Sequence, residues 1–338
     1  MRGAGGSSSE AAESAAACPG VSRAPHVKVA PVATLFLGGA AQAKMALDPN
    51  RRHFFLGALS LAVAGCREKP TQATAASLAL AEIEQASGGR LGVFAVDTGT
   101  GKELHHRADE RFPMCSTFKW VLAAAVLRHI ARGVLSFQQR VTLGEPDLLE
   151  YAPVSRKHLA DGFMTVEALL EAIVTLSDNT AANLLLRTVD GPAGLTHFIR
   201  DNGDSVTRLD RDEPLLNTNE PGDPRDTTSP RAMAHLMRRL LCDQGLPEPH
   251  RARLLTWMRA CETGNNRLRA GFPHDWIVGD KTGSGLHNAI NDVAIASPPG
   301  RAPVLVASYL SGGSSTKDAL EAAQAKVANL VARELTSR

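Results

Sequence analysis

Apolar and polar positions change their pattern along the chain. Residues 1–44 are rich in glycine, alanine and serine and follow neither a helical nor a strand period. Further on, apolar residues recur at the spacing of one helix face, which predicts helices over residues 77–86, 116–131, 165–176, 179–187, 193–200, 229–241, 249–260 and 315–335. Short apolar runs between turn residues predict strands over residues 91–96, 102–106, 276–282, 290–296 and 304–309.

The order of these elements predicts the architecture. Two predicted strands precede the helical middle of the chain and three follow it, so we expect one sheet that both ends of the chain complete. The helical middle forms a second lobe, and the junction of the two lobes is the expected site. Residues 208–228 are rich in Asp, Pro, Asn and Gly and predict a long loop, of a kind that proteins usually keep for function.

Composition narrows the classes of protein to consider. The chain has 338 residues, 43% of them hydrophobic, and a net charge of +2, so we expect a folded core rather than disorder. The balance of 37 basic and 35 acidic residues argues against a nucleic-acid partner. Five cysteines are too few for a disulfide scaffold, and the histidines lack the spacing of metal ligands, so no metal or cofactor is expected. No apolar run is long enough to predict a transmembrane helix.

The positive charge is concentrated in an N-terminal segment that has the pattern of an export signal. Residues 1–66 carry six basic and three acidic side chains, whereas residues 67–338 carry 31 and 32. Arg51 and Arg52 precede an apolar run that is too short to span a bilayer, and this pattern resembles a twin-arginine signal. The Val-Ala-Gly-Cys sequence that ends at Cys66 resembles a lipobox, in which the cysteine is acylated.

This N-terminal segment divides the chain into two parts. We expect residues 1–66 to be an extension with an export signal, and residues 67–338 to form the folded domain. The protein is therefore expected to be periplasmic or anchored to the membrane through Cys66. An ordinary cleavable signal is the alternative, and Met45 is a second candidate for the start of translation.

A serine and a lysine stand three residues apart at the start of the most apolar predicted helix. Ser116 and Lys119 therefore share one helix face, where the amine can reach the hydroxyl. A serine hydroxyl is a poor nucleophile and needs such a base nearby. The alternative is a capping serine with a surface lysine, and the apolar surroundings of Lys119 argue against it.

Two further motifs place polar groups beside predicted element ends. Ser177-Asp178-Asn179 lies between two predicted helices, where a hydroxyl could relay a proton to a leaving nitrogen and an amide could hold a ligand carbonyl. An N-terminal cap of the second helix is the alternative. Lys281-Thr282-Gly283 ends a predicted strand, where an ammonium and a hydroxyl suit a carboxylate, and a strand-end turn is the alternative.

The order of the three motifs is more specific than any one of them. Ser-x-x-Lys, Ser-Asp-Asn and Lys-Thr-Gly resemble the penicillin-recognising serine acyl-transferase superfamily, and class A β-lactamases in particular, over residues 77–336. The resemblance implies an α+β fold in which helices flank an antiparallel five-stranded sheet in three layers. An all-helical lobe lies beside it, with the active site between the two. The implied activity is hydrolysis of the β-lactam ring, which gives antibiotic resistance and needs no cofactor.

The resemblance also implies roles for individual residues. Ser116 is the nucleophile, Lys119 and Glu213 are alternative acylation bases, and Ser177 protonates the lactam nitrogen. Glu213 with Asn217 resembles the pair that holds the deacylating water. The backbone N–H groups of Ser116 and Ser284 are implied to form the oxyanion hole. Asn179 is implied to bind the amide of the substrate side chain, and Tyr151 to pack against the substrate as a wall. The implied contacts of the substrate carboxylate are Lys281, Thr282 and Ser284.

The loop and the cysteines show where the sequence follows the family and where it departs. Arg211 and Asp226 resemble the ion pair that clamps the loop. Ile290 replaces an arginine that many relatives use at the carboxylate, so the resemblance moves that role to Arg267. Two disulfides of the family cannot form here. The partner position of Cys115 is Gly285, and the two positions of the disulfide in the helical lobe are Ala123 and Leu170. We therefore expect Cys242 and Cys261 to stay free thiols as well.

Two other functions share the three motifs. A peptidoglycan DD-peptidase normally stops at a long-lived acyl-enzyme with β-lactams, and a β-lactam sensor domain acylates without turnover. Glu213 and Asn217 favour the hydrolase, because hydrolysis of the ester needs a base that activates water. The expected partners are a β-lactam and a hydrolytic water, without nucleic acid, and the chain is expected to be a monomer.

Overall fold

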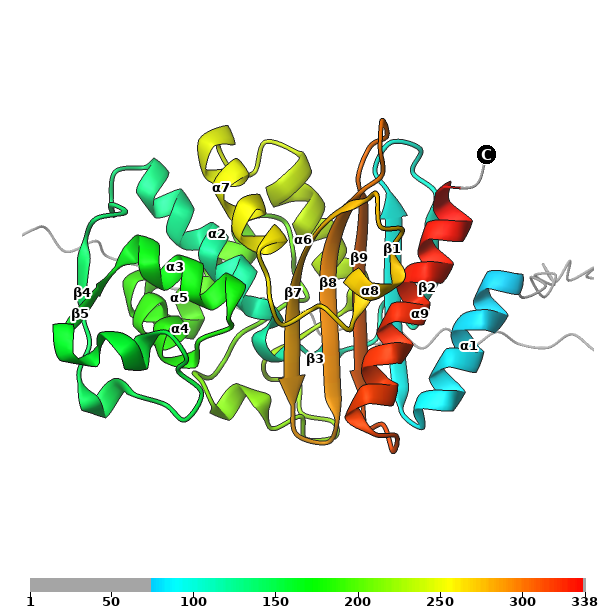
Figure 1. Ribbon diagram of the computed structural model, residues 1–338, viewed down its shortest axis with the longest axis horizontal. Coiled ribbons are helices and arrows are strands. Elements are labelled where there is room, and N and C mark those ends of the chain that lie inside the picture. The colour runs from blue at the N-terminus through cyan, green and yellow to red at the C-terminus, as the bar shows by residue number, and fades with distance from the viewer. Residues whose placement is uncertain (1–73, 337–338) are drawn as a thin grey trace, which may run out of the picture. The chain divides into compact units, whose positions relative to one another are not determined.

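A five-stranded antiparallel sheet dominates one side of the part that the computed structural model describes, residues 74–336 (Figure 1). Its strands are β1 (Arg90–Asp97), β2 (Glu103–His106), β7 (Ile277–Gly285), β8 (Ala289–Ser297) and β9 (Val304–Ser311). Their order is β2-β1-β9-β8-β7, and each strand runs antiparallel to its neighbours. Strands from both ends of the chain thus complete one sheet, as predicted.

Apolar residues face both sides of the sheet because helices cover both sides. Along β1, Leu91, Val93 and Ala95 belong to one apolar cluster, whereas Phe94 and Val96 belong to the other, as the two-residue period of a strand requires. The first cluster is completed by α1 (Ala75–Ser87), α8 (Leu268–Gly271) and α9 (Lys317–Thr336). The second contains α6 (Pro230–Met237) and the helical lobe. The three-layer α+β fold is therefore confirmed.

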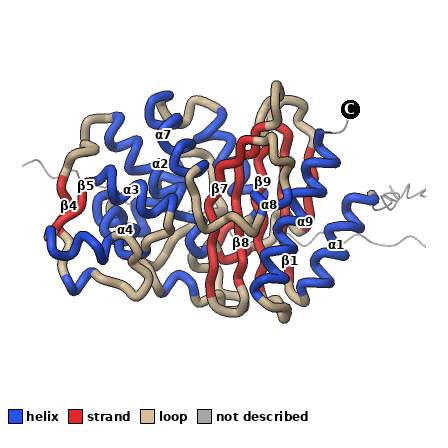
Figure 2. Tube along the Cα trace, viewed as in Figure 1, coloured by secondary structure: helices blue, strands red, loops and turns tan. Residues whose placement is uncertain are grey.

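The helical lobe is built around one helix that is buried over most of its length. It comprises α2 (Phe118–Ala131), α3 (Val166–Thr175), α4 (Asn179–Leu186), α5 (Gly191–Asp201) and α7 (Glu248–Arg259). Every residue of α2 from Phe118 to Leu127 is buried, which agrees with its apolar sequence on all sides. Figure 2 shows how this group of helices lies beside the sheet, with α1 and α9 on the far side of the strands.

The structure also contains short elements that the periodicity does not predict. Strands β3 (Phe112–Pro113) and β6 (Thr227–Thr228) pair with each other, as do β4 (Arg140–Thr142) and β5 (Phe163–Thr165). Two or three residues cannot show a period, so only tertiary pairing defines these strands. Helix α6 continues into a π-helical turn at Arg238–Cys242.

Two element boundaries near the motifs differ from the prediction. Ser116 lies on a 3-10 turn, Cys115–Thr117, and α2 begins only at Phe118. Strand β7 continues to Gly285 instead of ending at Thr282, because its ladder with β8 runs on to the pair Gly285–Ala289. The Lys-Thr-Gly motif therefore lies inside a strand, and the strand-end turn is excluded for it.

Some expectations fall partly or wholly outside the described residues. The export signal, Met45, Cys66 and the boundary between residues 66 and 67 all lie there. Within residues 74–336, no helix is long and apolar enough to cross a membrane. In the same range, Cys115, Cys242 and Cys261 are free thiols, which confirms the prediction for these three residues.

Candidate active site

The nucleophile candidate lies on a strained turn that the sheet approaches closely. Cys115, directly before Ser116, has a φ of +46°, a backbone conformation that costs a residue with a side chain roughly 1–3 kcal/mol. A Cβ atom on Gly283 of β7 would lie 2.7 Å from the carbonyl oxygen of Met114. Only glycine therefore lets β7 pack against the turn that carries Ser116.

Lys119 points into the protein rather than into solvent. Its side chain is fully buried, and its Nζ donates to the backbone oxygen of Ser177 at 2.8 Å and to Asn179 Oδ1 at 2.5 Å. Nζ also lies 2.9 Å from Glu213 Oε1. Burial lowers the pKa of Lys119, while the Glu213 carboxylate acts in the opposite direction. The alternative of a surface lysine is wrong.

The carboxylate of Glu213 receives hydrogen bonds from several sides. Ser116 Oγ donates to Glu213 Oε1 at 3.2 Å, on the same oxygen that contacts Lys119. Asn217 Nδ2 donates to the other oxygen, Oε2, at 2.5 Å. Glu213 itself is 3% exposed, so these donors replace solvent around the charge. The structure thus brings Ser116, Lys119, Glu213 and Asn217 together.

Asn183 fixes the backbone of Glu213 and was assigned no role from the sequence. Its Nδ2 donates to the backbone oxygen of Glu213 at 2.9 Å, and its Oδ1 accepts from the backbone N–H of Glu213 at 3.0 Å. Asn183 and Asn179 are four residues apart on α4, among mostly apolar neighbours, so they face the same way. That polar pair on an apolar helix is the signal that could have identified Asn183.

The loop that carries Glu213 is clamped by the expected ion pair. Arg211 Nε lies 2.5 Å from Asp226 Oδ2, and the other carboxylate oxygen accepts from the backbone N–H groups of Asp210 and Arg211 at 2.7 and 2.9 Å. Asp226 is fully buried. The loop-clamping pair is therefore confirmed, and it holds the two ends of the loop side by side.

Ser177 presents its hydroxyl to two buried lysines. Its Oγ accepts from Lys281 Nζ at 3.0 Å and from Lys119 Nζ at 3.4 Å. Its backbone has a φ of +60°, and the next residue secures this conformation: Asp178 caps α4 and also accepts from the backbone of Ser155. The cap expected as an alternative is thus present, but Asp178 provides it and leaves Ser177 facing the site.

Lys281 lies inside β7 with its ammonium in the same polar group. The side chain is fully buried, and Nζ donates to Ser177 Oγ and, at 2.9 Å, to the backbone oxygen of Thr282. Burial lowers the pKa of Lys281 to about 8, and the neighbouring charge of Lys119 acts in the same direction. The amines of Lys119 and Lys281 therefore share the Ser177 hydroxyl as a hydrogen-bond acceptor. An anionic ligand beside this hydroxyl would be attracted to positive charge on both lysines.

Arg267 is held by hydrogen bonds from every nitrogen of its guanidinium group. All five of its N–H groups donate within the protein, to Glu321 twice, to the backbone oxygens of Gly283 and Asn291, and to Ser284 Oγ at 2.8 Å. An arginine has five such donors, and Arg267 is 3% exposed. Arg267 thus supports Ser284 from behind, and its binding of a substrate carboxylate stays a prediction.

Tyr151 and Asn179 lie at the rim of the same group. Tyr151 is 48% exposed, and its hydroxyl donates to the backbone oxygen of Leu176 at 3.1 Å, which fixes the ring as an exposed surface. The backbone N–H of Asn179 donates to the backbone oxygen of Tyr151 at 3.1 Å. The exposed ring thus adjoins the residue that contacts Lys119.

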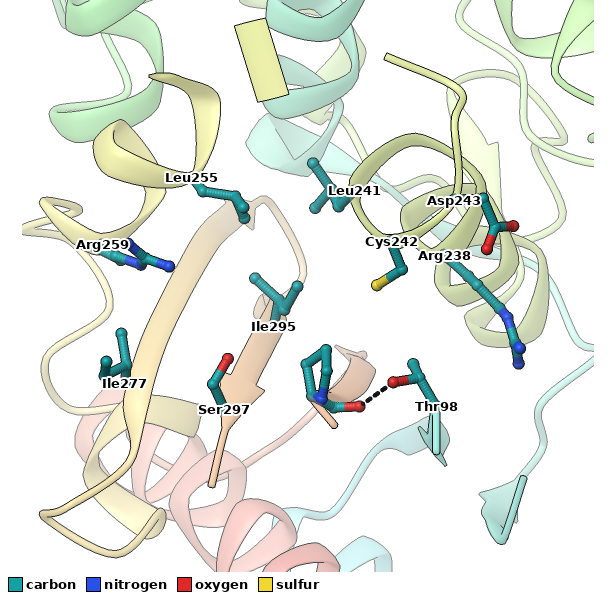
Figure 3. Close-up of a pocket in the computed structure, with 11 residues that line it drawn as sticks. Thr98, Arg238, Leu241, Cys242, Asp243, Leu255, Arg259, Ile277, Ile295 and Ser297 are labelled. Carbon is teal, nitrogen blue, oxygen red and sulfur yellow. Dashed lines mark hydrogen bonds between the residues drawn. The ribbon is translucent and has the colours of Figure 1, made fainter. Parts of the chain in front are cut away.

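A cavity elsewhere in the molecule is separate from these residues. It has a volume of about 400 Å³ and lies where the π-helical turn and α7 meet the sheet. Figure 3 shows Leu241, Leu255 and Ile295 around it, with the sulfur of Cys242 directed inward. Burial raises the pKa of the Cys242 thiol to about 11, so the thiol is protonated at neutral pH. None of the residues that surround Ser116 lines this cavity.

Comparisons with known proteins agree with this arrangement. A model of the β-lactamase enzyme family matches residues 75–335. β-Lactamase AST-1 of Nocardia asteroides is 49% identical over 237 residues, 70% of this chain and 76% of that protein. Carbapenem-hydrolyzing β-lactamase KPC of Klebsiella oxytoca is 44% identical over 285 residues, 83% of this chain and 95% of that protein. A solved structure of a class A β-lactamase, the last common ancestor of Gram-negative bacteria, is 55% identical with a TM-score of 0.76, covering 77% of this chain and 99% of that one.

Proposed function

We propose that this chain, which belongs to the β-lactamase enzyme family as a class A serine β-lactamase, hydrolyses β-lactams through an acyl-enzyme on Ser116. Glu213 is the proposed base for hydrolysis of that ester. The observation that carries this proposal is the Glu213 carboxylate itself. One of its oxygens accepts from Ser116 Oγ at 3.2 Å, and the other accepts from Asn217. A base at this distance reaches both the nucleophile and a water beside the ester.

Acylation begins with removal of the Ser116 proton. The hydrogen bond from Ser116 Oγ to Glu213 Oε1 supports Glu213 as the acceptor, directly or through a water. Lys119, 2.9 Å from the same oxygen, holds the carboxylate in place, and its lowered pKa keeps it as the alternative base. Ser116 Oγ attacks the lactam carbonyl, and the backbone N–H groups of Ser116 and Ser284 stabilise the oxyanion.

Ring opening requires a proton on the lactam nitrogen, and Ser177 is the proposed donor. Its hydroxyl contacts both Lys281 and Lys119, so the proton it gives up is replaced from an ammonium. The proton that Glu213 took from Ser116 then passes to the lysines through Lys119, 2.9 Å away, which restores both the ammonium and the carboxylate. In the second half of the reaction, Glu213 takes a proton from water, the hydroxide attacks the ester carbonyl, and the bond to Ser116 Oγ breaks. Ser116 then recovers its proton from Glu213.

Substrate binding is proposed for the polar groups around this centre. Lys281, Thr282 and Ser284 lie in succession on β7 and would hold the substrate carboxylate, with Arg267 supporting Ser284. Asn179 would bind the side-chain amide, and the exposed ring of Tyr151 would form a wall. The expected partner is a single β-lactam on a monomeric enzyme.

A DD-peptidase or a sensor domain would also be acylated at Ser116, so turnover is the measurement that separates the three functions. We expect the purified protein to hydrolyse many equivalents of a chromogenic cephalosporin. A burst of one equivalent, followed by a stable adduct in the mass spectrum, would instead show a protein that does not deacylate. Such a result would overturn the hydrolase proposal.

The pKa of Lys281 predicts a pH dependence. We expect kcat/KM for a carboxylate-bearing β-lactam to fall as the pH rises through about 8, because the free enzyme then loses the ammonium that attracts the carboxylate. Arginine stays charged throughout this range, so Lys281→Arg should move the decline to higher pH even if its absolute activity is lower. A decline at the same pH in both proteins would exclude Lys281 as its source and point to Lys119.

The N-terminal segment supports a proposal about location. We propose export by a twin-arginine-like signal and acylation of Cys66, on the basis of the paired arginines and the lipobox-like sequence. Arg51→Lys with Arg52→Lys should leave the protein in the cytoplasm, and Cys66→Ala should abolish incorporation of labelled palmitate. Cys242→Ala is the matched control and should keep the label. Palmitate incorporation that persists in Cys66→Ala would refute the anchor.

A further inference from the structure

A row of small polar side chains lies behind Thr282 and belongs to none of the three motifs. Thr263 Oγ1 lies 2.6 Å from Thr282 Oγ1, and Cys261 Sγ lies 3.3 Å from Thr263 Oγ1. We propose that Thr263 is a positioning residue that donates its proton to Thr282, so that Thr282 donates its own proton to the substrate carboxylate. This inference rests on the carboxylate-binding role proposed above for Thr282.

The geometry limits where each proton can lie. Two hydroxyl oxygens 2.6 Å apart share one proton, so either Thr263 or Thr282 is the donor. If Thr282 donated to Thr263, its only proton would point away from the substrate. If Thr263 donates, the proton of Thr282 is free to turn towards the substrate. The direction of this one hydrogen bond therefore decides whether Thr282 is a donor or only an acceptor for a ligand.

The groups behind Thr263 favour Thr263 as the donor. Burial raises the pKa of Cys261 to about 11, so this residue is a thiol whose proton can be donated to Thr263 Oγ1, 3.3 Å from the sulfur. Thr263 in turn can donate either to the sulfur or to Thr282 Oγ1. Sulfur is a weak acceptor and a hydroxyl oxygen is a better one, so Thr263 donates to Thr282.

Asp280 packs against the segment that carries Thr263. Its side chain forms an ion pair with Arg269. Burial raises the pKa of Asp280, while the charge of Arg269 acts in the opposite direction. Gly264 confirms how closely the segment packs here, since a Cβ atom on it would lie 1.8 Å from Asp280 Oδ2.

The substrate group that matches this arrangement is an anion. A carboxylate only accepts hydrogen bonds, and its bonds are stronger than those of neutral acceptors, so it gains most from a hydroxyl that is already turned towards it. An ester at the same position is neutral and gains less. Thr263 should therefore act on the binding of the carboxylate rather than on the chemistry at Ser116, which lies on a different element.

The test compares two substrates in matched variants. For benzylpenicillin we expect Thr263→Val to raise KM by about 3–10-fold with kcat nearly unchanged, the scale of one lost hydrogen bond. For benzylpenicillin methyl ester the same variant should change KM little. Thr263→Ser keeps the donor and should restore the wild-type KM. Thr256→Val, which removes an exposed hydroxyl that bonds only within α7, is the control. Thr263→Ala repeats the measurement if the valine does not fit.

Thr282→Val separates a failure of this inference from a failure of the role of Thr282. If Thr282→Val impairs benzylpenicillin more than the ester but Thr263→Val impairs both equally or neither, the positioning role of Thr263 is overturned alone. If Thr282→Val does not discriminate between the substrates, the carboxylate-binding role of Thr282 fails and this inference fails with it. A loss confined to the carboxylate in both variants, with rescue by Thr263→Ser, supports the proposal.

Discussion

Replacing Glu213 with alanine is expected to trap the enzyme as an ester on Ser116. The variant loses the base that activates the deacylating water, while the lysine-lined side of the site remains. Loss of a positioned base costs about 10²–10⁴-fold in rate, so steady-state turnover should fall by that amount. Acylation should slow less if Lys119 can accept the Ser116 proton, and the acyl-enzyme would then accumulate.

The measurement is mass spectrometry of the protein after mixing with a chromogenic cephalosporin, together with the rate of colour formation. Wild type should show free protein and continuous turnover, whereas Glu213→Ala should show a long-lived adduct. Glu220→Gln is a matched control, because Glu220 lies in the same loop but is exposed, and its side chain forms a long ion pair of 3.8 Å with His287. Deacylation of Glu213→Ala at the wild-type rate would contradict the proposed base.

Removing the hydroxyl of Ser116 is expected to abolish covalent chemistry altogether. Loss of a serine nucleophile in a hydrolase lowers kcat by about 10⁶-fold, because no other group takes its place. Ser116→Ala should therefore show neither turnover nor an adduct. The neighbouring thiol of Cys115 is no substitute, since burial raises its pKa to about 12 and it stays protonated.

This second variant completes a comparison with the first. An adduct in Glu213→Ala but not in Ser116→Ala identifies the ester as one on Ser116. Ser136→Ala, at an exposed position between α2 and β4, should behave as wild type and controls for the substitution itself. An adduct of the same mass in Ser116→Ala would show that the nucleophile is another residue, and mass spectrometry of the peptides from that adduct would identify it.

Several features of the fold were predictable because they depend on local pattern. The all-apolar residues 121–127 in the middle of a predicted helix predict that this helix is buried, and α2 is buried from Phe118 to Leu127. Strands early and late in the chain predict one shared sheet, and β1 pairs with β9. Elements of two or three residues, such as β3 and β6, were missed because their only cause is a partner more than a hundred residues away.

The candidate site divides in the same way. The three motifs and the resemblance to class A β-lactamases were enough to select Ser116, Lys119, Ser177, Glu213, Asn217 and Lys281, and the structure brings them into one hydrogen-bonded group. The role of Arg267 at the carboxylate stays a prediction, and only the structure shows that its donors also hold Ser284 and Glu321, because a sequence does not show which donors of an arginine are used within the protein. Asn183 received no role because its contact, the backbone of Glu213, has no side-chain signature in the sequence.

What the sequence alone determined is therefore the chemistry: which nucleophile, which amines and which carboxylate the chain carries, and that it resembles class A β-lactamases. Only the tertiary structure decided the state and direction of those groups. Burial of Lys119 and Lys281 sets their pKa values, and the packing of Thr263 between Cys261 and Thr282 sets the direction of a proton. The physical reason is that desolvation and hydrogen-bond direction depend on neighbours that are distant in sequence, whereas residue type does not.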